Sequence, residues 1–428
     1  MVASLRLRLP RALLDPLRRD LPCGDADGLL AVELHLAQGR VAAIHSLAGE
    51  PGTESLPLAL TPLVDAHVHL DKAFSWGAYP NRAGTMAGAL AANLQEGERR
   101  SVEQVLERGE AALQRAWRHG LRALRSHVDS GGSGAAASWE ALLTLRERWR
   151  GRIALQLVAL TPLAFWGSPE GEALAQRVAR AGGLLGGVLG PPYPRGQADR
   201  QDLLALLRLA DRLGCGIDLH VDEGGEQPGR GVRLLVELLE RHRLSVPISC
   251  SHSSSLGLLA EGPRRRLVER MAALDLAVVA LPTTNFWLLG RRHQLTTPER
   301  PLAPVRLLQQ AGVPVAIAAD NVQDPWFPGG DFDPLDTLRL ALLAVQLAPW
   351  SRQGLMPFTT VPSRMLQLAW DGVLRSGSPA DLLVLAASSW SELLARSPQR
   401  RVLRDGQWLP PPPAEQPDPR LTALSRLP

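Results

Sequence analysis

The chain has 428 residues, of which 45% are hydrophobic and 21% charged, and its formal net charge is +4. This length suits one large domain with an appendage, and the composition excludes an intrinsically disordered chain. Arg and Glu are interspersed in stretches such as 98–110, which is typical of a solvated helix face and not of a nucleic-acid-binding patch. We therefore expect no nucleic-acid partner.

The sequence also argues against a secreted or membrane-bound protein. Arg and Pro interrupt the apolar stretch of residues 1–20, which breaks the pattern of a signal peptide. Every uncharged run is shorter than the about 18–20 residues that a membrane span needs. Cys23, Cys215 and Cys250 form no CxxC pair, as expected of free thiols in a reducing compartment. We expect a cytoplasmic protein with no membrane partner.

Alternating apolar and polar residues at the two ends of the chain predict β-hairpins. Residues 29–50 alternate about a turn at Gln38-Gly39. Residues 380–387 and 400–410 form a second strand group, with a turn at Asp405-Gly406. We expect one small β-sandwich domain built from residues 1–59 and 361–428, the latter ending in a proline-rich tail.

Between these ends, residues 60–360 alternate short apolar runs with amphipathic stretches such as 202–214 and 233–243. Strand–helix alternation indicates a parallel sheet, and eight units match the size of a closed barrel. We predict a distorted (β/α)8 TIM barrel; an open doubly wound sheet is the alternative, but no glycine-rich phosphate loop follows the first strand. The predicted strands are 60–69, 121–129, 153–161, 184–190, 216–223, 246–252, 276–283 and 313–320.

Ionisable side chains follow most of these strands. Carboxyl ends of barrel strands converge on one face. A single strand-end histidine is more often a satisfied buried residue, but so many arriving together indicate one site. The residues in question are His67, His69, His127, Asp129, His220, Asp222, Glu223, His252 and Asp320.

The pair His67 and His69 predicts a metal site. Residues i and i+2 share one face of a strand, so both imidazoles can reach one ion. Imidazole with carboxylate suits Zn or Fe(II), and the metal lowers the pKa of water from 15.7 to about 7. Glu223, just beyond a strand end, can carry a proton; the following Gly224-Gly225 leaves a surface-loop glutamate as the alternative.

Five blocks together resemble the cytosine deaminase branch of the amidohydrolase superfamily, over residues 29–410. They are DAHVHLDKAF (65–74), RSHVDS (125–130), DLHVDE (218–223), SCSHSSS (249–255) and AADNVQDPW (318–326). The resemblance implies a homo-oligomeric enzyme that deaminates a small heterocycle. It implies that one divalent metal ion, Zn or Fe, is held by His67, His69, His220 and Asp320.

The same resemblance implies roles for three side chains. His252 would hydrogen-bond the attacking hydroxide and the developing tetrahedral centre, Asp320 would take the proton from water, and Glu223 would protonate the ring nitrogen. Two-metal members of the superfamily often bridge their ions with a carboxylated lysine. Lys72 is the only lysine here and follows the first strand, which favours one metal.

The chain departs from the cytosine deaminase pattern at the positions that contact the substrate in that branch. Pro162 stands where that branch has a glutamine, Leu160 where it has a phenylalanine, and Asn321 where it has a second aspartate. Asn321 is shared with branch members that hydrolyse N-alkylated aminotriazines. With Trp326 nearby, these residues predict a pocket that disfavours cytosine. Three alternatives stay open: an N-substituted aminotriazine hydrolase, a ring-opening cyclic amidase and a non-catalytic ligand-binding relative.

Overall fold

The computed structural model describes residues 3–191, 193, 196–291, 295–351 and 353–410. The chain divides into two compact units. One comprises residues 63–117 and 121–372, and the other residues 1–62, 118–120 and 373–428. The proline-rich tail predicted beyond residue 410 lies outside the described residues. No helix in the described ranges is long and apolar enough to span a membrane.

The larger unit is a parallel eight-stranded barrel, as predicted. Its strands follow one another in sequence order from β5 to β12. A parallel bridge between Val68 and Asp320 joins the last strand to the first, and the Asp320 amide donates to the His67 carbonyl at 2.9 Å. The strands are β5 (Leu63–Val68), β6 (Leu121–Asp129), β7 (Ala154–Leu160), β8 (Leu184–Leu189), β9 (Ile217–Val221), β10 (Ile248–His252), β11 (Ala277–Ala280) and β12 (Val315–Ile317).

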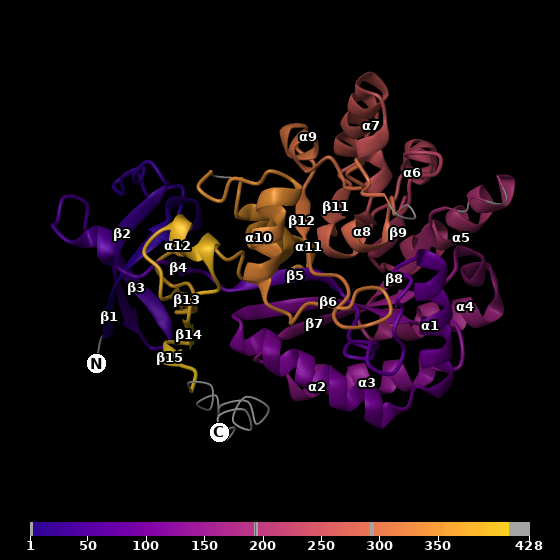
Figure 1. Ribbon diagram of the computed structural model, residues 1–428, viewed down its shortest axis with the longest axis horizontal. Coiled ribbons are helices and arrows are strands. Elements are labelled where there is room, and N and C mark those ends of the chain that lie inside the picture. Colours follow the sequence, from indigo (N-terminus) through magenta and orange to yellow (C-terminus); the bar gives the residue numbers. More distant parts are fainter. Residues whose placement is uncertain (1–2, 192, 194–195, 292–294, 352, 411–428) are drawn as a thin grey trace, which may run out of the picture. The chain divides into compact units, whose positions relative to one another are not determined.

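Helices lie outside the strands of this unit, as Figure 1 shows. Helix α6 buries Val232, Leu235, Val236 and Leu239, at the i, i+3, i+4 and i+7 spacing of one apolar stripe. The helices are α1 (Met86–Arg99), α2 (Val102–Arg118), α3 (Ala135–Arg148), α4 (Pro169–Arg180), α5 (Gln197–Leu213), α6 (Arg230–Arg241), α7 (Glu261–Ala273), α8 (Pro282–Leu288), α9 (Val305–Gln310), α10 (Pro334–Ala344) and α11 (Thr360–Met365). Short 3-10 turns occur at Leu163–Gly167, Ser254–Leu258 and Met356–Phe358.

The structure differs from the sequence-based expectations for the barrel at three places. The strand expected over 276–283 ends at Ala280, because Pro282 begins helix α8, and proline suits the first turn of a helix. The sequence analysis also missed α1, which the Thr85 side chain caps by accepting from the Gly88 amide. Helix α11 contacts β5 and β12, so residues 361–372 belong to the barrel unit.

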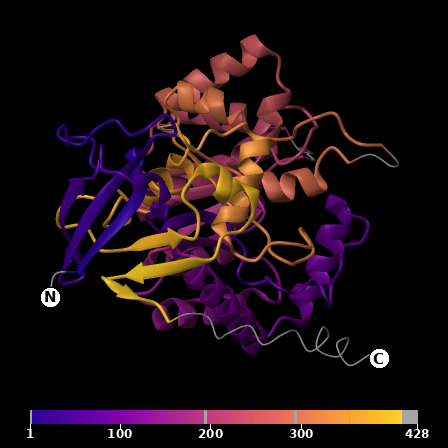
Figure 2. The same cartoon turned by 60° about the vertical axis from the view of Figure 1, so that its left-hand side comes forward.

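The smaller unit contains two antiparallel sheets built from both ends of the chain. One sheet has the order β1-β2-β3 and the other β15-β14-β13-β4. Figure 2 shows the yellow C-terminal strands beside the indigo N-terminal ones. Its elements are β1 (Ala3–Pro10), β2 (Leu29–Ala37), β3 (Arg40–Ser46), β4 (Ala59–Leu60), β13 (Leu382–Leu385), β14 (Arg400–Arg404) and β15 (Gln407–Trp408), with helix α12 (Trp390–Ala395) and 3-10 turns at Arg11–Leu13 and Thr53–Ser55.

The predicted hairpin turns of this unit are confirmed. Gln38 and Gly39 have φ values of 50° and 72°, and Asp405 and Gly406 have 46° and 71°. Two consecutive left-handed residues are the signature of the two-residue turn that joins twisted strands. Strand β1 was not predicted, although the alternation of leucine and arginine over residues 5–9 is a strand pattern.

Candidate metal centre and active site

Five histidines from four strands meet at the carboxyl end of the barrel. His67 and His69 come from the end of β5, His127 from β6, His220 from β9 and His252 from β10. The His67 ring lies 3.8 Å from that of His127 and 4.7 Å from that of His220, and the rings of His220 and His252 are 5.0 Å apart. All five side chains are buried. We call this group the histidine cluster.

Asp320 completes the cluster. Its Oδ1 atom lies 3.5 Å from Nε2 of His67 and 3.4 Å from Nε2 of His69. Asp320 and His252 adopt left-handed backbone conformations, with φ values of 67° and 65°. Such conformations cost of order 1 kcal/mol in non-glycine residues and gather at functional sites.

The unpartnered atoms of this group fit a divalent metal ion. Within the described residues, Nε2 of His67, Nδ1 of His69, Nδ1 of His220 and both carboxylate oxygens of Asp320 are buried without a hydrogen bond. Two ligands bound to one tetrahedral ion at about 2.1 Å lie about 3.4 Å apart. The distances from Asp320 Oδ1 to the unpartnered Nε2 of His67 and to Nε2 of His69 match this value, so Nε2 and not Nδ1 is the atom of His69 that would face the ion. Groups of three histidines have ligand atoms within 4.8 Å of one another: His67, His220 and His252, and His67, His69 and His127.

A hydrogen-bonded chain inside the barrel fixes the tautomer of His67. The Ser251 hydroxyl donates to Asp218 Oδ1 at 2.6 Å and lies 2.8 Å from Nδ1 of His67. Because a carboxylate only accepts, the hydroxyl must accept its second bond from an Nδ1–H. Arg125 holds the other Asp218 oxygen at 2.7 Å. The lone pair of His67 is therefore on Nε2, facing Asp320, as a metal ligand requires.

Electrostatics favour the ligand forms of these groups. Burial lowers the pKa of His67 and His220 well below the usual value, and neighbouring histidines lower it further. Burial raises the pKa of Asp320, but its contacts with His69 and His252 outweigh that effect and the net pKa is lowered. At neutral pH the neutral imidazoles of His67 and His220 thus stand with the ionised carboxylate of Asp320, which is a donor set that suits a metal ion.

Glu223 lies beside the histidine cluster on the mouth of the barrel. Its Oε2 is 3.5 Å from Nε2 of His252, and its side chain is 11% exposed. Burial, together with the charge of Asp320, raises the pKa of Glu223 well above the usual value. Burial lowers the pKa of His252 to about 4, and the Asn285 amide lies 3.0 Å from its Nδ1. Glu223 is thus an acid of raised pKa next to an imidazole of lowered pKa.

The predicted substrate-binding residues lie at or after the carboxyl ends of β7 and β12. Leu160 ends β7 and pairs with Asp129, whereas Pro162 is exposed and precedes the 3-10 turn at Leu163. Asn321 is buried, accepts from Thr284 at 3.3 Å and donates to Asp324 at 2.8 Å. The indole nitrogen of Trp326 is buried and has no partner among the described residues.

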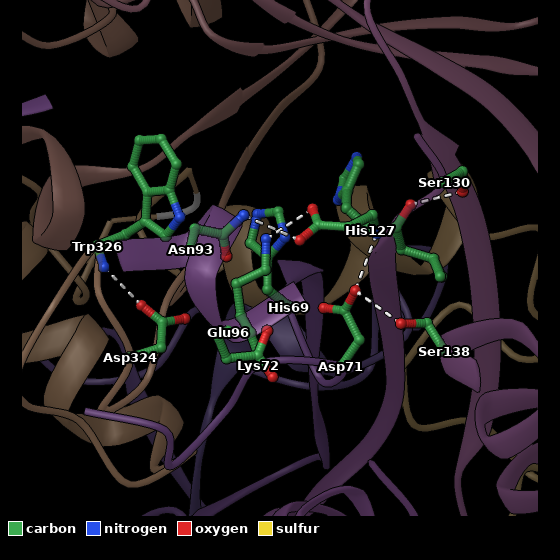
Figure 3. A network of polar contacts seen from close by, with 12 residues as sticks. His69, Asp71, Lys72, Asn93, Glu96, His127, Ser130, Ser138, Asp324 and Trp326 are labelled. Carbon is green, nitrogen blue, oxygen red and sulfur yellow. Dashed lines mark hydrogen bonds and ion pairs between the residues drawn. The ribbon is translucent and has the colours of Figure 1, made fainter. Parts of the chain in front are cut away.

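The sequence analysis missed a buried ion-pair network next to the cluster, drawn in part in Figure 3. Arg100 contacts Asp71 at 2.9 Å and Asp129 at 3.2 Å, and it also pairs with Glu96. Lys72 contacts Asp129 at 2.7 Å. We call Asp71, Lys72, Glu96, Arg100, Arg108 and Asp129 the ion-pair network. Its three acids and three bases balance in charge. The i,i+4 spacing of Glu96 and Arg100 is the signal that the sequence carries, whereas the contact of Lys72 with Asp129 spans 57 residues.

Comparison with known proteins places the chain in a family. Residues 82–409 match the model of the amidohydrolase family. The chain belongs to the amidohydrolase family. Members of this family are metal-dependent, and the chain is accordingly a hydrolase of carbon–nitrogen bonds whose histidines can hold a metal.

Two curated relatives span most of the chain. A pterin deaminase of Rhizobium rhizogenes is 35% identical over 347 residues, which are 80% of this chain and 78% of the relative. An N-isopropylammelide isopropyl amidohydrolase of a Pseudomonas species is 25% identical over 354 residues, 80% of this chain and 84% of the relative.

Solved structures share the fold. A 5-methylcytosine deaminase of Klebsiella pneumoniae, liganded with phosphonocytosine, superposes with a TM-score of 0.79 at 24% identity, covering 96% of this chain and 100% of the other. An N-isopropylammelide isopropylaminohydrolase of Burkholderia multivorans gives a TM-score of 0.70 at 24% identity, covering 94% and 97%. The predicted fold and family are confirmed.

Proposed function

We propose that this chain removes an exocyclic amino group from a small nitrogen heterocycle by metal-dependent hydrolysis. The observation that carries the proposal is the Asp320 carboxylate, buried without a hydrogen bond and facing Nε2 of His67 and of His69, in a buried group of histidines that also includes His252 beside Glu223. The curated relative that is 35% identical is a pterin deaminase, which supports a deaminase and makes pteridines the first substrates to test.

We further propose one ion, Zn or Fe(II), held by His67, His69, His220 and Asp320. Three imidazoles with one carboxylate suit either metal. Lys72 contacts Asp129 and is the only lysine, which argues against a lysine bridge between two ions. The chemistry that such an ion supplies when bound is the acidification of water, whose pKa falls from 15.7 to about 7.

The chain's own residues would manage protons and charge during the reaction. Asp320 is ionised at neutral pH and can accept a proton from the attacking water. Glu223, whose pKa burial raises, can deliver a proton to a ring nitrogen, which lets the amino-bearing carbon accept the nucleophile. His252, neutral and 3.5 Å from Glu223, can donate to the oxygen at the developing tetrahedral centre.

The test is a coupled ammonia-release assay on metal-loaded protein with pyrimidines, purines, pterins and triazines. We expect ammonia from at least one bicyclic aminoheterocycle. We expect cytosine to be turned over poorly, because Pro162 and Leu160 cannot make the polar and aromatic contacts expected at those positions. Failure to release ammonia from any of these would contradict a deaminase. A cytosine kcat/KM near ~10⁵ M⁻¹s⁻¹ would contradict the prediction that Pro162 disfavours cytosine.

A second candidate is the hydrolysis of an N-substituted aminotriazine. Asn321 after Asp320 favours it, and so does the relative that is an N-isopropylammelide isopropyl amidohydrolase. The released product separates the candidates, since this reaction yields a substituted amine and no ammonia. A new carboxylate would instead mark a ring-opening amidase, and ligand binding without turnover would mark a non-catalytic relative.

We propose that the enzyme acts in the cytoplasm as a homo-oligomer on a small-molecule substrate. Its three cysteines are free, and Cys215 and Cys250 are buried, as expected of a protein kept in a reducing compartment. Size-exclusion chromatography with light scattering would test the oligomeric state.

A further inference from the structure

The only lysine of the chain is buried with unused hydrogen-bonding capacity. Lys72 is 2% exposed, and its Nζ atom donates to Asp129 Oδ1 at 2.7 Å. This is its one hydrogen bond to the residues that the structure describes. An ammonium has three donors, so two N–H groups have no protein partner there. Burial lowers the pKa of Lys72, but Asp129 and Asp71 raise it above the usual value, so the group stays charged.

A second unpartnered group lies next to this lysine. Asn93, on α1, donates through Nδ2 to Asp129 Oδ2 at 3.1 Å, and its Oδ1 is buried without a partner in the described part of the chain. Because a carboxylate only accepts, the bond to Asp129 fixes the orientation of the amide. The free atom of Asn93 is therefore an acceptor.

A third unpartnered group is the indole N–H of Trp326, which is buried and without a hydrogen bond to any described residue. In Figure 3 the Trp326 nitrogen is turned toward Asn93, and Asn93 and Lys72 lie together beside His69. Trp326 also packs on α1 through the cluster that contains Ala89. Two kinds of donor and one acceptor thus adjoin the metal centre.

Burying unpartnered polar groups is costly, so this combination indicates a ligand that pairs with them. A carbonyl oxygen can accept from both Lys72 and Trp326, and a neighbouring N–H can donate to Asn93. A carboxylate would meet the two donors but would repel Asn93 Oδ1 and the ionised Asp129. A purely aromatic edge would leave Lys72 unpaired, and the amino-bearing carbon faces the histidine cluster in the proposed orientation. A neutral lactam, –NH–C(=O)–, offers the two lone pairs of its oxygen to Lys72 and Trp326 and its N–H to Asn93.

We propose that Lys72, Trp326 and Asn93 bind the lactam of the substrate, and that the enzyme acts on heterocycles carrying an amino group and a ring lactam together. This inference rests on the proposed deaminase function, since it assumes that the amino-bearing carbon faces the histidine cluster.

The test compares two substrates that differ only in the lactam: 2-amino-4-oxopteridine and 2-aminopteridine. We expect the wild type to prefer the first by at least about 10²-fold in kcat/KM, because a site built to bond a polar group rejects the analogue that lacks it. Lys72→Met should lower kcat/KM for the lactam by about 10²-fold and change the other substrate less than about threefold. Equal losses on both substrates, or an unchanged preference, would overturn the proposal.

Two further variants separate recognition from folding. Arg108→Met removes a cation of the same ion-pair network that contacts Glu96, and it should leave the preference unchanged. Trp326→Phe keeps an aromatic ring and removes the N–H together with the five-membered part of the indole, so it should lower turnover of the lactam substrate more than that of the other substrate, by about tenfold. The Trp326 variant keeps the proposal testable should Lys72→Met not fold.

Binding to metal-free protein distinguishes this inference from the proposed function. By calorimetry we expect 2,4-dioxopteridine to bind at least about tenfold more tightly than 2-oxopteridine, and Lys72→Met to abolish the difference. Discrimination in binding without turnover of either pteridine would support the lactam site and contradict the deaminase. Equal binding, with turnover of both substrates, would support the deaminase and overturn the lactam site.

Discussion

The histidine cluster and the ion-pair network are neighbouring groups of buried polar residues, but they differ in whether their polar atoms have partners. In the network, Arg100 alone contacts three carboxylates, and acids and bases balance. In the cluster, nitrogens and carboxylate oxygens face one another with no partner among the described residues. Paired buried charges maintain structure, whereas unpaired buried lone pairs indicate a missing ligand. Changes in the cluster should therefore abolish function, whereas changes in the network outside the proposed lactam site, such as those at Arg100, should mainly lower stability.

The largest effect is expected from His220→Ala. Removal of a proposed ligand should reduce bound metal to a small fraction of one ion per chain and abolish turnover, while the fold is kept. Metal analysis and circular dichroism of the same preparation check this. A folded variant that keeps its full metal content would show that His220 is not a ligand.

Glu223→Gln should keep the metal and lose activity by about 10²–10⁴-fold, because a general acid–base group contributes that much. The pH dependence gives a second test. Burial raises the pKa of Glu223 well above the usual value, and the contribution of the protonated acid is lost as the pH rises through that pKa. The wild-type kcat/KM should fall on this alkaline limb, which the glutamine variant should lack. Activity within a few-fold of wild type would rule out the role.

Arg100→Met should test the network as a structural feature. Breaking a buried pair costs about 3–5 kcal/mol, so Tm should fall by roughly 10 °C. The exposed pair of Arg115 and Asp331 is the matched control, and Arg115→Met should cost at most about 1 kcal/mol. Thermal unfolding followed by calorimetry compares them. Equal stability of the two variants would mean that the network contributes no more than a surface pair.

The smallest effect is expected at Ser251, which joins His67 of the histidine cluster to the buried, ion-paired Asp218. Ser251→Ala removes the acceptor that fixes the His67 tautomer, so metal affinity should fall about 10–100-fold. Ser251→Thr keeps the hydroxyl and should restore most of it. Competition with a chromophoric chelator measures both. If alanine and threonine variants bind metal as tightly as the wild type, the hydrogen-bonded chain does not position His67.

Periodicity made the barrel predictable, because parallel strands are continuous apolar runs and their carboxyl ends carry the polar side chains. His67, His69, His220, His252 and Asp320 were all anticipated at those ends, and the structure brings them together. The residues proposed to act with Lys72 could not be anticipated, since Asn93 lies on α1, whose amphipathic pattern was not recognised. The orientation of the Asn93 amide depends on a contact with Asp129, 36 residues away. Strand β1 was missed although its alternation is visible.

The most direct test of the central claim is the metal content of the purified wild-type chain. Mass-spectrometric metal analysis, before and after chelation, should find close to one Zn or Fe per chain, and reloading should restore ammonia release. The same treatment of Arg115→Met should give the same stoichiometry. A folded, active protein with far less than one ion per chain, or one unaffected by complete removal of metal, would contradict the account.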